Sequence, residues 1–243
     1  MADIVLVHGI TESKHSWDPL LAPLSASHRV LAVDLPGHGS STSDGPFDLG
    51  AMAGDVFATM AEAGFSPASS VLVGHSLGGT VVSAMASASA VRGVINVDQP
   101  LDLAGFQDGL RQLQPMLEGD NAAFLSAVSM VFAAMRGPLS DAESERIEAI
   151  RWPKQPVVLA VWSPVLHSSA DELNGLVRSM AQNISAPYLS LHGIDPGPAY
   201  YGFLTDLLPH AQMEVWADHG HYPHLVAPAR FVDRVDSFVA TLR

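Results

Sequence analysis

The fold is decided by the stretch Val71-Leu72-Val73-Gly74-His75-Ser76-Leu77-Gly78-Gly79. Its apolar start predicts a buried strand, and the alanine-rich pattern that continues to about residue 90 predicts a helix. Ser76 therefore stands at the apex of a sharp turn between the two. A turn this tight needs small residues beside the serine, because a Cβ at Gly74 or Gly78 would collide with the neighbouring backbone. We expect the Ser76 hydroxyl at the carboxyl edge of a sheet, where the N-terminus of the next helix points toward it.

Strand, turn and helix together match the context of the G-x-S-x-G nucleophile elbow. On this motif the chain resembles the serine hydrolases of the α/β-hydrolase superfamily. The resemblance implies that Ser76 is a catalytic nucleophile. The plainer interpretation of the same residues is a strand-to-helix turn without chemistry, so the other motifs have to decide between the two.

Short apolar runs alternate with helical patterns along the rest of the chain. This alternation predicts an α/β fold, with a mostly parallel sheet of about six strands and helices on both of its faces. Strands are expected near Ile4–Val7, Arg29–Val33, Ser70–Gly74, Gly93–Val97, Pro187–His192 and Gln212–Trp216. Helices are expected near Leu49–Ala63, Leu77–Ala90, Ala199–Leu208 and Ala227–Leu242.

Residues 101–185 interrupt the alternation with a spacing that is mostly helical. The resemblance implies that this interval is a cap, or lid, inserted after the fourth strand and covering the serine. The alternative is that its helices belong to the core of the main domain. Residues 1–100 and 186–243 would then form the α/β-hydrolase core. The chain also begins directly at the first parallel strand, without the antiparallel hairpin of many superfamily members, which is why a six-stranded sheet is expected.

The composition restricts the classes of partner. A chain of 243 residues is long enough for one domain with a sizeable core. Its net charge of −13 and the lack of a basic run argue against nucleic acid, and the absence of cysteine excludes disulfides and thiol catalysis. The N-terminus lacks the basic region of a secretory signal, and the apolar stretch Phe124–Met135 is too short to span a membrane. We expect a soluble cytoplasmic protein without a membrane partner.

Two loops follow the first two expected strands. His8-Gly9-Ile10 stands where the superfamily begins its oxyanion loop. The resemblance implies that the backbone amides of Ile10 and Leu77 stabilise the negative charge that develops on a carbonyl oxygen, while His8 braces the loop. Residues 34–40, DLPGHGS, are similar to the D-x-P-G-x-G-x-S turn of the family. We interpret this turn, with Asp34, as structural.

The general base must be a histidine that reaches Ser76 Oγ. In the superfamily this histidine follows the last strand, and His221 occupies that position in the segment 218–225, DHGHYPHL. The flanking His219 and His224 are expected to be loop residues. The three histidines also reproduce the H-x-H-x-x-H spacing of some zinc sites. That metal motif requires an aspartate at the position of Pro223, so we expect no metal and no other cofactor.

The acid that orients the histidine is ambiguous, because two aspartates follow strands at the same edge of the expected sheet. Asp98 ends the strand before the expected cap, and Asp195 ends the strand after it. Most superfamily members use the later position in a G-x-x-D arrangement, whereas this chain has G-x-D. Some relatives take the acid from the earlier position. We favour Asp98, with Asp195 as the alternative acid. If Asp98 has no catalytic role, it would be a buried, hydrogen-bonded residue that braces the hinge of the cap. If Asp195 has none, it would be an Asx-turn residue before Pro196.

The expected cap is rich in aromatic and methionine residues, which suits a small, fairly hydrophobic substrate. The sequence thus favours a serine hydrolase that cleaves carboxylic ester or lactone bonds through an acyl-enzyme on Ser76. A carbon–carbon bond hydrolase, a hydroxynitrile lyase or a cofactor-free peroxidase could use the same triad, because fold and triad do not determine the substrate. A ligand receptor without turnover is a further alternative. The oligomeric state is not indicated by the sequence.

Overall fold

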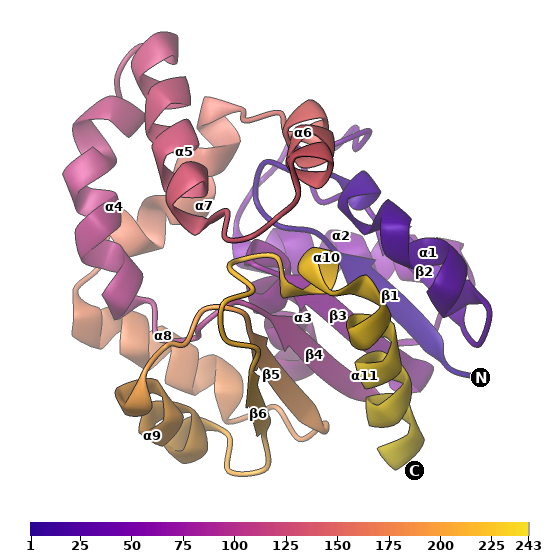
Figure 1. The fold of residues 1–243 in the computed structure, drawn as a ribbon. Helices are drawn as coiled ribbons and strands as arrows, with labels where there is room; N and C mark the ends of the chain where they lie inside the picture. Colours follow the sequence, from indigo (N-terminus) through magenta and orange to yellow (C-terminus); the bar gives the residue numbers. More distant parts are fainter. Residues whose placement is uncertain (243) are drawn as a thin grey trace.

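The computed structural model describes residues 1–242 and contains one sheet whose strand order is β2-β1-β3-β4-β5-β6 (Figure 1). The strands are β1 (Asp3–Val7), β2 (Arg29–Val33), β3 (Ser70–His75), β4 (Gly93–Val97), β5 (Tyr188–His192) and β6 (Gln212–Val215). All neighbouring strands pair in parallel. The expected α/β fold with a parallel sheet of six strands is confirmed.

Helices cover both faces of this sheet because side chains of a strand alternate between the faces. These helices are α1 (Asp18–Ser25), α2 (Leu49–Glu62), α3 (Leu77–Ala88), α8 (Ala170–Ala181), α9 (Pro198–Leu207) and α11 (Pro228–Thr241). In β1, Ile4 and Leu6 pack with α1 and α11, whereas Val5 and Val7 pack on the opposite face with α2, α3, α8 and α9. Since both faces are covered, the central strands are buried throughout, which explains their continuous apolar sequences.

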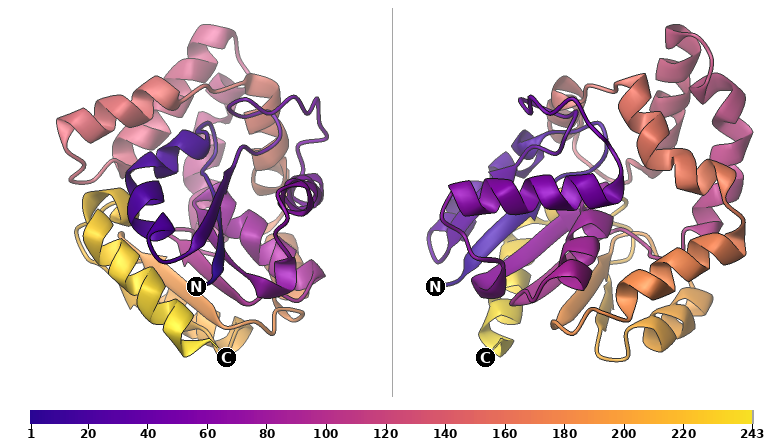
Figure 2. Two further views of the ribbon diagram at one scale, coloured as in Figure 1. Left: turned by 90° about the vertical axis from the view of Figure 1, so that its right-hand side faces the viewer. Right: turned by 180° about the vertical axis from the view of Figure 1, so that it is seen from behind.

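The chain between β4 and β5 forms α4 (Ala104–Leu117), α5 (Asn121–Met135), α6 (Asp141–Ile150), α7 (Gln155–His167) and then α8. Helices α4, α5 and α7 share an apolar cluster that includes Phe124, Phe132 and Trp162 and extends to Ile10. These helices lie beyond one end of the sheet, and both termini lie at the opposite end (Figure 2). The expected cap range, 101–185, also includes α8, but Val177 and Ala181 of α8 join the cluster on the α3 face of the sheet.

Several short elements have no counterpart among the expected helices. Two 3-10 turns, η1 (Lys14–Trp17) and η2 (Pro67–Ser69), and the one-turn helix α10 (Pro223–Val226) were not expected, nor was α1. Helix α1 carries Pro23 in its interior, which removes one backbone hydrogen bond and weakens the helical signal. Its Leu20 and Leu24 are nevertheless fully buried against the sheet, and this tertiary packing stabilises the helix.

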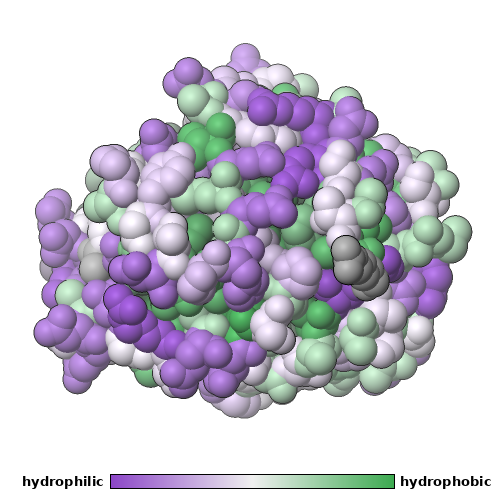
Figure 3. All heavy atoms as spheres, turned by 90° about the horizontal axis from the view of Figure 1, so that it is seen from below, coloured by the Kyte–Doolittle hydropathy of each residue, from purple (hydrophilic) through white to green (hydrophobic). Residues whose placement is uncertain are grey.

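The outer surface bears mixed polarity. Seen from below, hydrophilic side chains cover much of the face, with smaller hydrophobic areas between them (Figure 3). Within residues 1–242, no helix combines the length and apolar character needed to cross a bilayer.

Candidate active site

Ser76 occupies a strained position between β3 and α3. Its backbone angles are φ 52° and ψ −125°, a conformation that is rare for a residue with a side chain. A Cβ on Gly74 would lie 2.1 Å from the carbonyl oxygen of Gly78, and a Cβ on Gly78 would lie 2.2 Å from the carbonyl oxygen of Val7. The glycines expected to permit this turn are therefore required for it. The half-buried Ser76 is held in place by a 3.0 Å hydrogen bond from its backbone N–H to the carbonyl of Val97.

Backbone strain is concentrated around this serine. The non-glycine residues with positive φ within 1–242 are Thr11, Ser76, Asp98 and Asp218. They belong, in that order, to the expected oxyanion loop, the elbow, the end of β4 and the loop that carries His221. Such conformations cost about 1–3 kcal/mol each and persist where the surrounding structure enforces them, as at functional sites. Their coincidence at the carboxyl end of the sheet marks this region as the candidate active site.

The structure brings His221 and Asp98 together. His221 Nδ1 lies 2.7 Å from Asp98 Oδ2, and both side chains are buried. The other carboxylate oxygen, Oδ1, accepts hydrogen bonds from the backbone N–H groups of Gly193 at 2.7 Å and Ile194 at 3.2 Å. Burial alone would raise the pKa of Asp98, but the hydrogen bond and charge of His221 and the two backbone donors lower it below its ordinary value. Asp98 is therefore an ionised acceptor.

An ionised Asp98 determines the tautomer of the His221 ring. Because a carboxylate only accepts, Nδ1 of His221 must carry the proton that it shares with Asp98. In the neutral imidazole, Nε2 then presents a lone pair. This Nε2 atom is buried and has no hydrogen-bond partner among residues 1–242. A histidine in this state can accept a proton from a neighbouring hydroxyl.

Asp195, the alternative acid, lies in a different environment. Its side chain is exposed, and its Oδ1 accepts a 2.8 Å hydrogen bond from the backbone N–H of Gly197. This is the geometry of an Asx turn before Pro196. The structure thus brings Asp98, and not Asp195, to the imidazole of His221.

The expected oxyanion loop lies against the turn that carries Ser76. A Cβ on Gly9 would be 3.2 Å from the Cβ of Ser76, so the loop and the serine are nearly in van der Waals contact. Leu77 is the first residue of α3, where backbone N–H groups have no partner within the helix. His8 is fully buried, and its Nδ1–H donates to the carbonyl of Gly9 at 2.7 Å while Nε2 accepts from the N–H of Leu35 at 3.1 Å. His8 therefore braces the loop that carries Ile10.

Asp34 likewise has structural partners. Its carboxylate accepts hydrogen bonds from the backbone N–H of Lys14 at 2.7 Å and from the N–H and hydroxyl of Ser40 at 3.1 and 2.8 Å. These bonds close the turn after β2 onto the segment that follows the expected oxyanion loop.

The three histidines with metal-like spacing lie in separate environments. His219 is partly exposed and bonds the carbonyl of Ala217, His221 faces Asp98, and His224 is fully buried between the rings of Trp17 and His75. Burial lowers the pKa of His224 well below its ordinary value. Residues 1–242 contain no group of three His, Cys, Asp or Glu side chains arranged to hold a metal ion.

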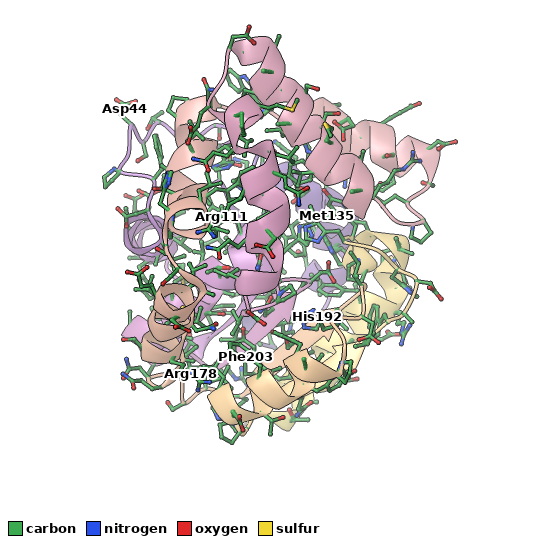
Figure 4. The ribbon with its side chains drawn as sticks, turned by 90° about the vertical axis from the view of Figure 1, so that its left-hand side faces the viewer. Asp44, Arg111, Met135, Arg178, His192 and Phe203 are labelled. Atoms are coloured by element: carbon green, nitrogen blue, oxygen red, sulfur yellow. The ribbon has the colours of Figure 1, made fainter. Side chains whose placement is uncertain are left out.

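A contact between the insertion and the loop of His221 was not expected from the sequence. The backbone N–H of His221 donates to the carbonyl of Met135, at the end of α5 (Figure 4), at 3.0 Å. Gly137 and Gly220 both have positive φ and touch so closely that a Cβ on either would lie 2.5 Å from the Cα of the other. The helical insertion therefore packs directly on the backbone of His221.

A buried polar group behind the site was also missed. Glu12, His75, Tyr222 and Arg151 contact one another, with Glu12 at their centre. Two of these residues are adjacent in sequence to proposed catalytic residues, but no local motif connects all four, because they come from four distant segments.

Comparisons with known proteins agree with this fold. The model of the alpha/beta hydrolase family matches residues 4–234. The magnesium-chelatase 30 kDa subunit of Rhodobacter capsulatus is 30% identical over 186 residues, which cover 74% of this chain but only 61% of that protein. The pimeloyl-[acyl-carrier protein] methyl ester esterase of Yersinia enterocolitica is 26% identical, with 97% of this chain and 92% of that protein covered. A crystal structure of an esterase from Rhodococcus sp. ECU1013 is 26% identical with a TM-score of 0.73, covering 100% of this chain and 91% of that chain.

Proposed function

The chain belongs to the alpha/beta hydrolase family, and we propose that it is a serine hydrolase that cleaves carboxylic ester or lactone bonds through an acyl-enzyme on Ser76. The observation that carries this proposal is the 2.7 Å contact between Asp98 Oδ2 and His221 Nδ1, which leaves the buried Nε2 of His221 without a partner within 1–242. Ser76, on its strained turn, supplies the hydroxyl that such a base activates.

The proposed reaction has two half-reactions. Ser76 Oγ attacks the carbonyl carbon of the ester while His221 Nε2 accepts the hydroxyl proton. The negative charge on the carbonyl oxygen is stabilised by the backbone N–H groups of Ile10 and Leu77. His221 then donates its proton to the leaving alkoxide, and the alcohol departs. Water, deprotonated by His221, attacks the acyl-enzyme, and the carboxylic acid is released as Ser76 regains its proton.

The surroundings of the site support a small, fairly hydrophobic substrate. Ile10 is buried in the apolar cluster of the cap, and Leu77, Phe106 and Met116 pack against the same cluster. The arginines of the insertion already have partners, which are carbonyls, carboxylates, a tyrosine hydroxyl or phenylalanine rings. They are Arg111, Arg136, Arg146, Arg151 and Arg178. An uncharged acyl or alkoxy group therefore fits this environment better than an anionic one.

Two relatives support the ester class. The protein from Yersinia enterocolitica is a methyl ester esterase, and the protein from Rhodococcus is an esterase; this chain is 26% identical to each. The lactone class differs from these only in that the leaving alkoxide stays attached to the acyl group, and the same proposed triad serves both.

The proposal is tested by intact-mass labelling with a fluorophosphonate, followed by hydrolysis of p-nitrophenyl esters of increasing chain length with and without a chelator. We expect one adduct on the wild type, turnover that a chelator leaves unchanged, and no adduct on Ser76→Ala. Turnover of Ser76→Ala should fall by about 10⁴-fold or more. The control is Ser89→Ala, which removes an exposed serine at the end of α3 and should keep both labelling and turnover. Ester hydrolysis retained by Ser76→Ala would contradict the mechanism.

A further inference from the structure

Glu12 is a carboxylate buried at the point where the parts of the proposed site meet. Its side chain is 1% exposed. Oε1 accepts a 2.8 Å hydrogen bond from the hydroxyl of Tyr222 and lies 3.8 Å from a guanidinium nitrogen of Arg151. Oε2 lies 3.8 Å from Nδ1 of His75. Burying a carboxylate without such partners would cost a large amount of free energy, so these contacts are what allow Glu12 to be buried here.

Each partner of Glu12 comes from a different part of the site. Glu12 itself follows the oxyanion loop by two residues, and His75 immediately precedes Ser76. Tyr222 immediately follows His221. Arg151 comes from the insertion, between α6 and α7, where its guanidinium lies 3.9 Å from the centre of the Phe132 ring. One carboxylate thus joins the oxyanion loop, the elbow, the histidine loop and the cap.

His75 connects Glu12 to the proposed base. Nε2 of His75 lies 2.8 Å from the backbone carbonyl of His221. A carbonyl only accepts, so Nε2–H of His75 is the donor. The opposite nitrogen of the same ring, Nδ1, lies 3.8 Å from Oε2 of Glu12, which is too far for a hydrogen bond, so Glu12 acts on this ring through its charge. The ring also contacts those of His221 and Tyr222, with centroid separations of 4.6 and 4.9 Å.

The charge of Glu12 is maintained by these partners. Burial alone would raise the pKa of Glu12, but the interactions with His75, Arg151 and Tyr222 lower it well below its ordinary value. Buried ion pairs add little net stability compared with apolar residues of the same volume. The placement of this carboxylate is therefore better explained by what it orients than by the stability it adds.

We propose that Glu12 is a positioning residue: through His75 it holds the main chain of His221 in the place from which the imidazole can take the proton of Ser76. This inference rests on the proposed function. It assigns to Glu12 no contact with the substrate, and it predicts that the charge and geometry of Glu12 affect the rate of acylation more than the binding of substrate.

The test compares Glu12→Gln with Asp34→Asn. The first variant keeps the volume of Glu12 and removes its charge. The second does the same to a carboxylate whose side chain is 7% exposed and whose hydrogen bonds go to Lys14 and Ser40 instead of His75 or His221. Pre-steady-state hydrolysis of a p-nitrophenyl ester gives a burst amplitude, which counts active sites, and a rate constant for each active site. A merely structural residue changes the amplitude and the thermal midpoint, whereas a positioning residue changes the rate constant.

We expect Glu12→Gln to lower the acylation rate constant by about 10- to 100-fold, because small displacements of a catalytic group have effects of this size. The substrate dissociation constant, taken from the dependence of the acylation rate on ester concentration, should stay within about threefold of the wild type. Asp34→Asn should keep the wild-type rate constant for each active site. If Glu12→Gln does not fold, His75→Ala and His75→Gln replace it, and the glutamine variant should recover most of the lost rate because its amide can donate to the carbonyl of His221. An unchanged rate constant in the folded variants would overturn the proposal.

A second readout does not depend on activity. The proton on Nδ1 of His221, shared with Asp98, gives a proton resonance far downfield in the NMR spectrum, and we expect Glu12→Gln to shift or broaden it while Asp34→Asn leaves it in place. If the wild type neither reacts with fluorophosphonate nor hydrolyses esters, the proposed function fails, and this resonance still decides the role of Glu12. A resonance unchanged by Glu12→Gln would then overturn the positioning role.

Discussion

Replacing Asp98 by asparagine should invert the tautomer of His221, and the structure shows why the new side chain has only one acceptable orientation. Oδ1 of Asp98 accepts from the backbone N–H groups of Gly193 and Ile194, while Oδ2 accepts from Nδ1–H of His221. In Asp98→Asn, the single amide oxygen must keep facing the two backbone donors, because an NH₂ group there would oppose two N–H groups. The amide NH₂ then faces Nδ1 of His221.

This orientation removes the base. Facing a donor, Nδ1 of His221 must become the acceptor, so the ring proton moves to Nε2, the atom that should receive the proton of Ser76. The equivalent change in serine proteases lowers kcat by about 10⁴-fold, which corresponds to about 5 kcal/mol of lost transition-state stabilisation. We expect a loss of this size in Asp98→Asn, with little change in the free energy of unfolding, since the number of hydrogen bonds is kept.

The assay measures ester hydrolysis and the rate of fluorophosphonate labelling, together with urea unfolding. Asp195→Asn is the matched control, because the amide oxygen of asparagine can make the same Asx turn to Gly197 that the exposed Asp195 makes. This control should keep its activity within about twofold. The reasoning is refuted if Asp98→Asn remains active, or if Asp195→Asn loses activity by orders of magnitude.

The remaining predictions concern stability. Burial lowers the pKa of His38 to about 3 and that of His192 to about 4, whereas unfolded histidine titrates near pH 6.5. The contribution of these histidines to the free energy of unfolding is thus complete above pH 6.5 and is lost as the pH falls toward their folded pKa values. Urea unfolding at pH 5 should show a loss of about 2 kcal/mol for each histidine, and His192→Gln should lose less than the wild type. A free energy of unfolding that does not depend on pH would contradict this. Gly137→Ala should lower both stability and turnover, because φ is 62° and the added Cβ would lie 2.5 Å from the Cα of Gly220. The control is Gly64→Ala, where φ is 73° and the space around the added Cβ is open. It should lower the free energy of unfolding by only about 1–2 kcal/mol and keep its activity. Equal losses in the two glycine variants would contradict the importance of the contact between Gly137 and Gly220.

Local patterns in the sequence were sufficient for most of the sheet. Buried parallel strands are continuous apolar runs, and strands β1 to β6 were predicted within about two residues of their ends. Helix α1 was missed because Pro23 weakens its local signal and its stability comes from packing on the sheet. The elbow was predictable because a Cβ on Gly74 or Gly78 would collide with backbone atoms that lie nearby in the chain or in the adjacent strand β1, so the need for glycine is visible in the local sequence.

The residues around Ser76 were predictable to the extent that their motifs are local. Ile10, Leu77 and His221 each stand at a recognisable place after a strand, so their proposed roles could be read along the chain. The proposed role of Glu12 could not be predicted in this way, because it depends on contacts with Tyr222, Arg151 and His75, which only folding brings together.

The choice of acid separates the two kinds of information most clearly. By itself, the sequence determined an α/β sheet with a serine on a tight turn, a histidine after the last strand and two aspartates after the neighbouring strands β4 and β5. Both aspartates satisfy the same local rule, so sequence spacing left them open. The tertiary structure places the loop of His221 over the end of β4 by packing Gly220 on Gly137 and bonding His221 to Met135. Which carboxylate meets the imidazole therefore depends on long-range packing, and a pattern of neighbouring residues does not encode it.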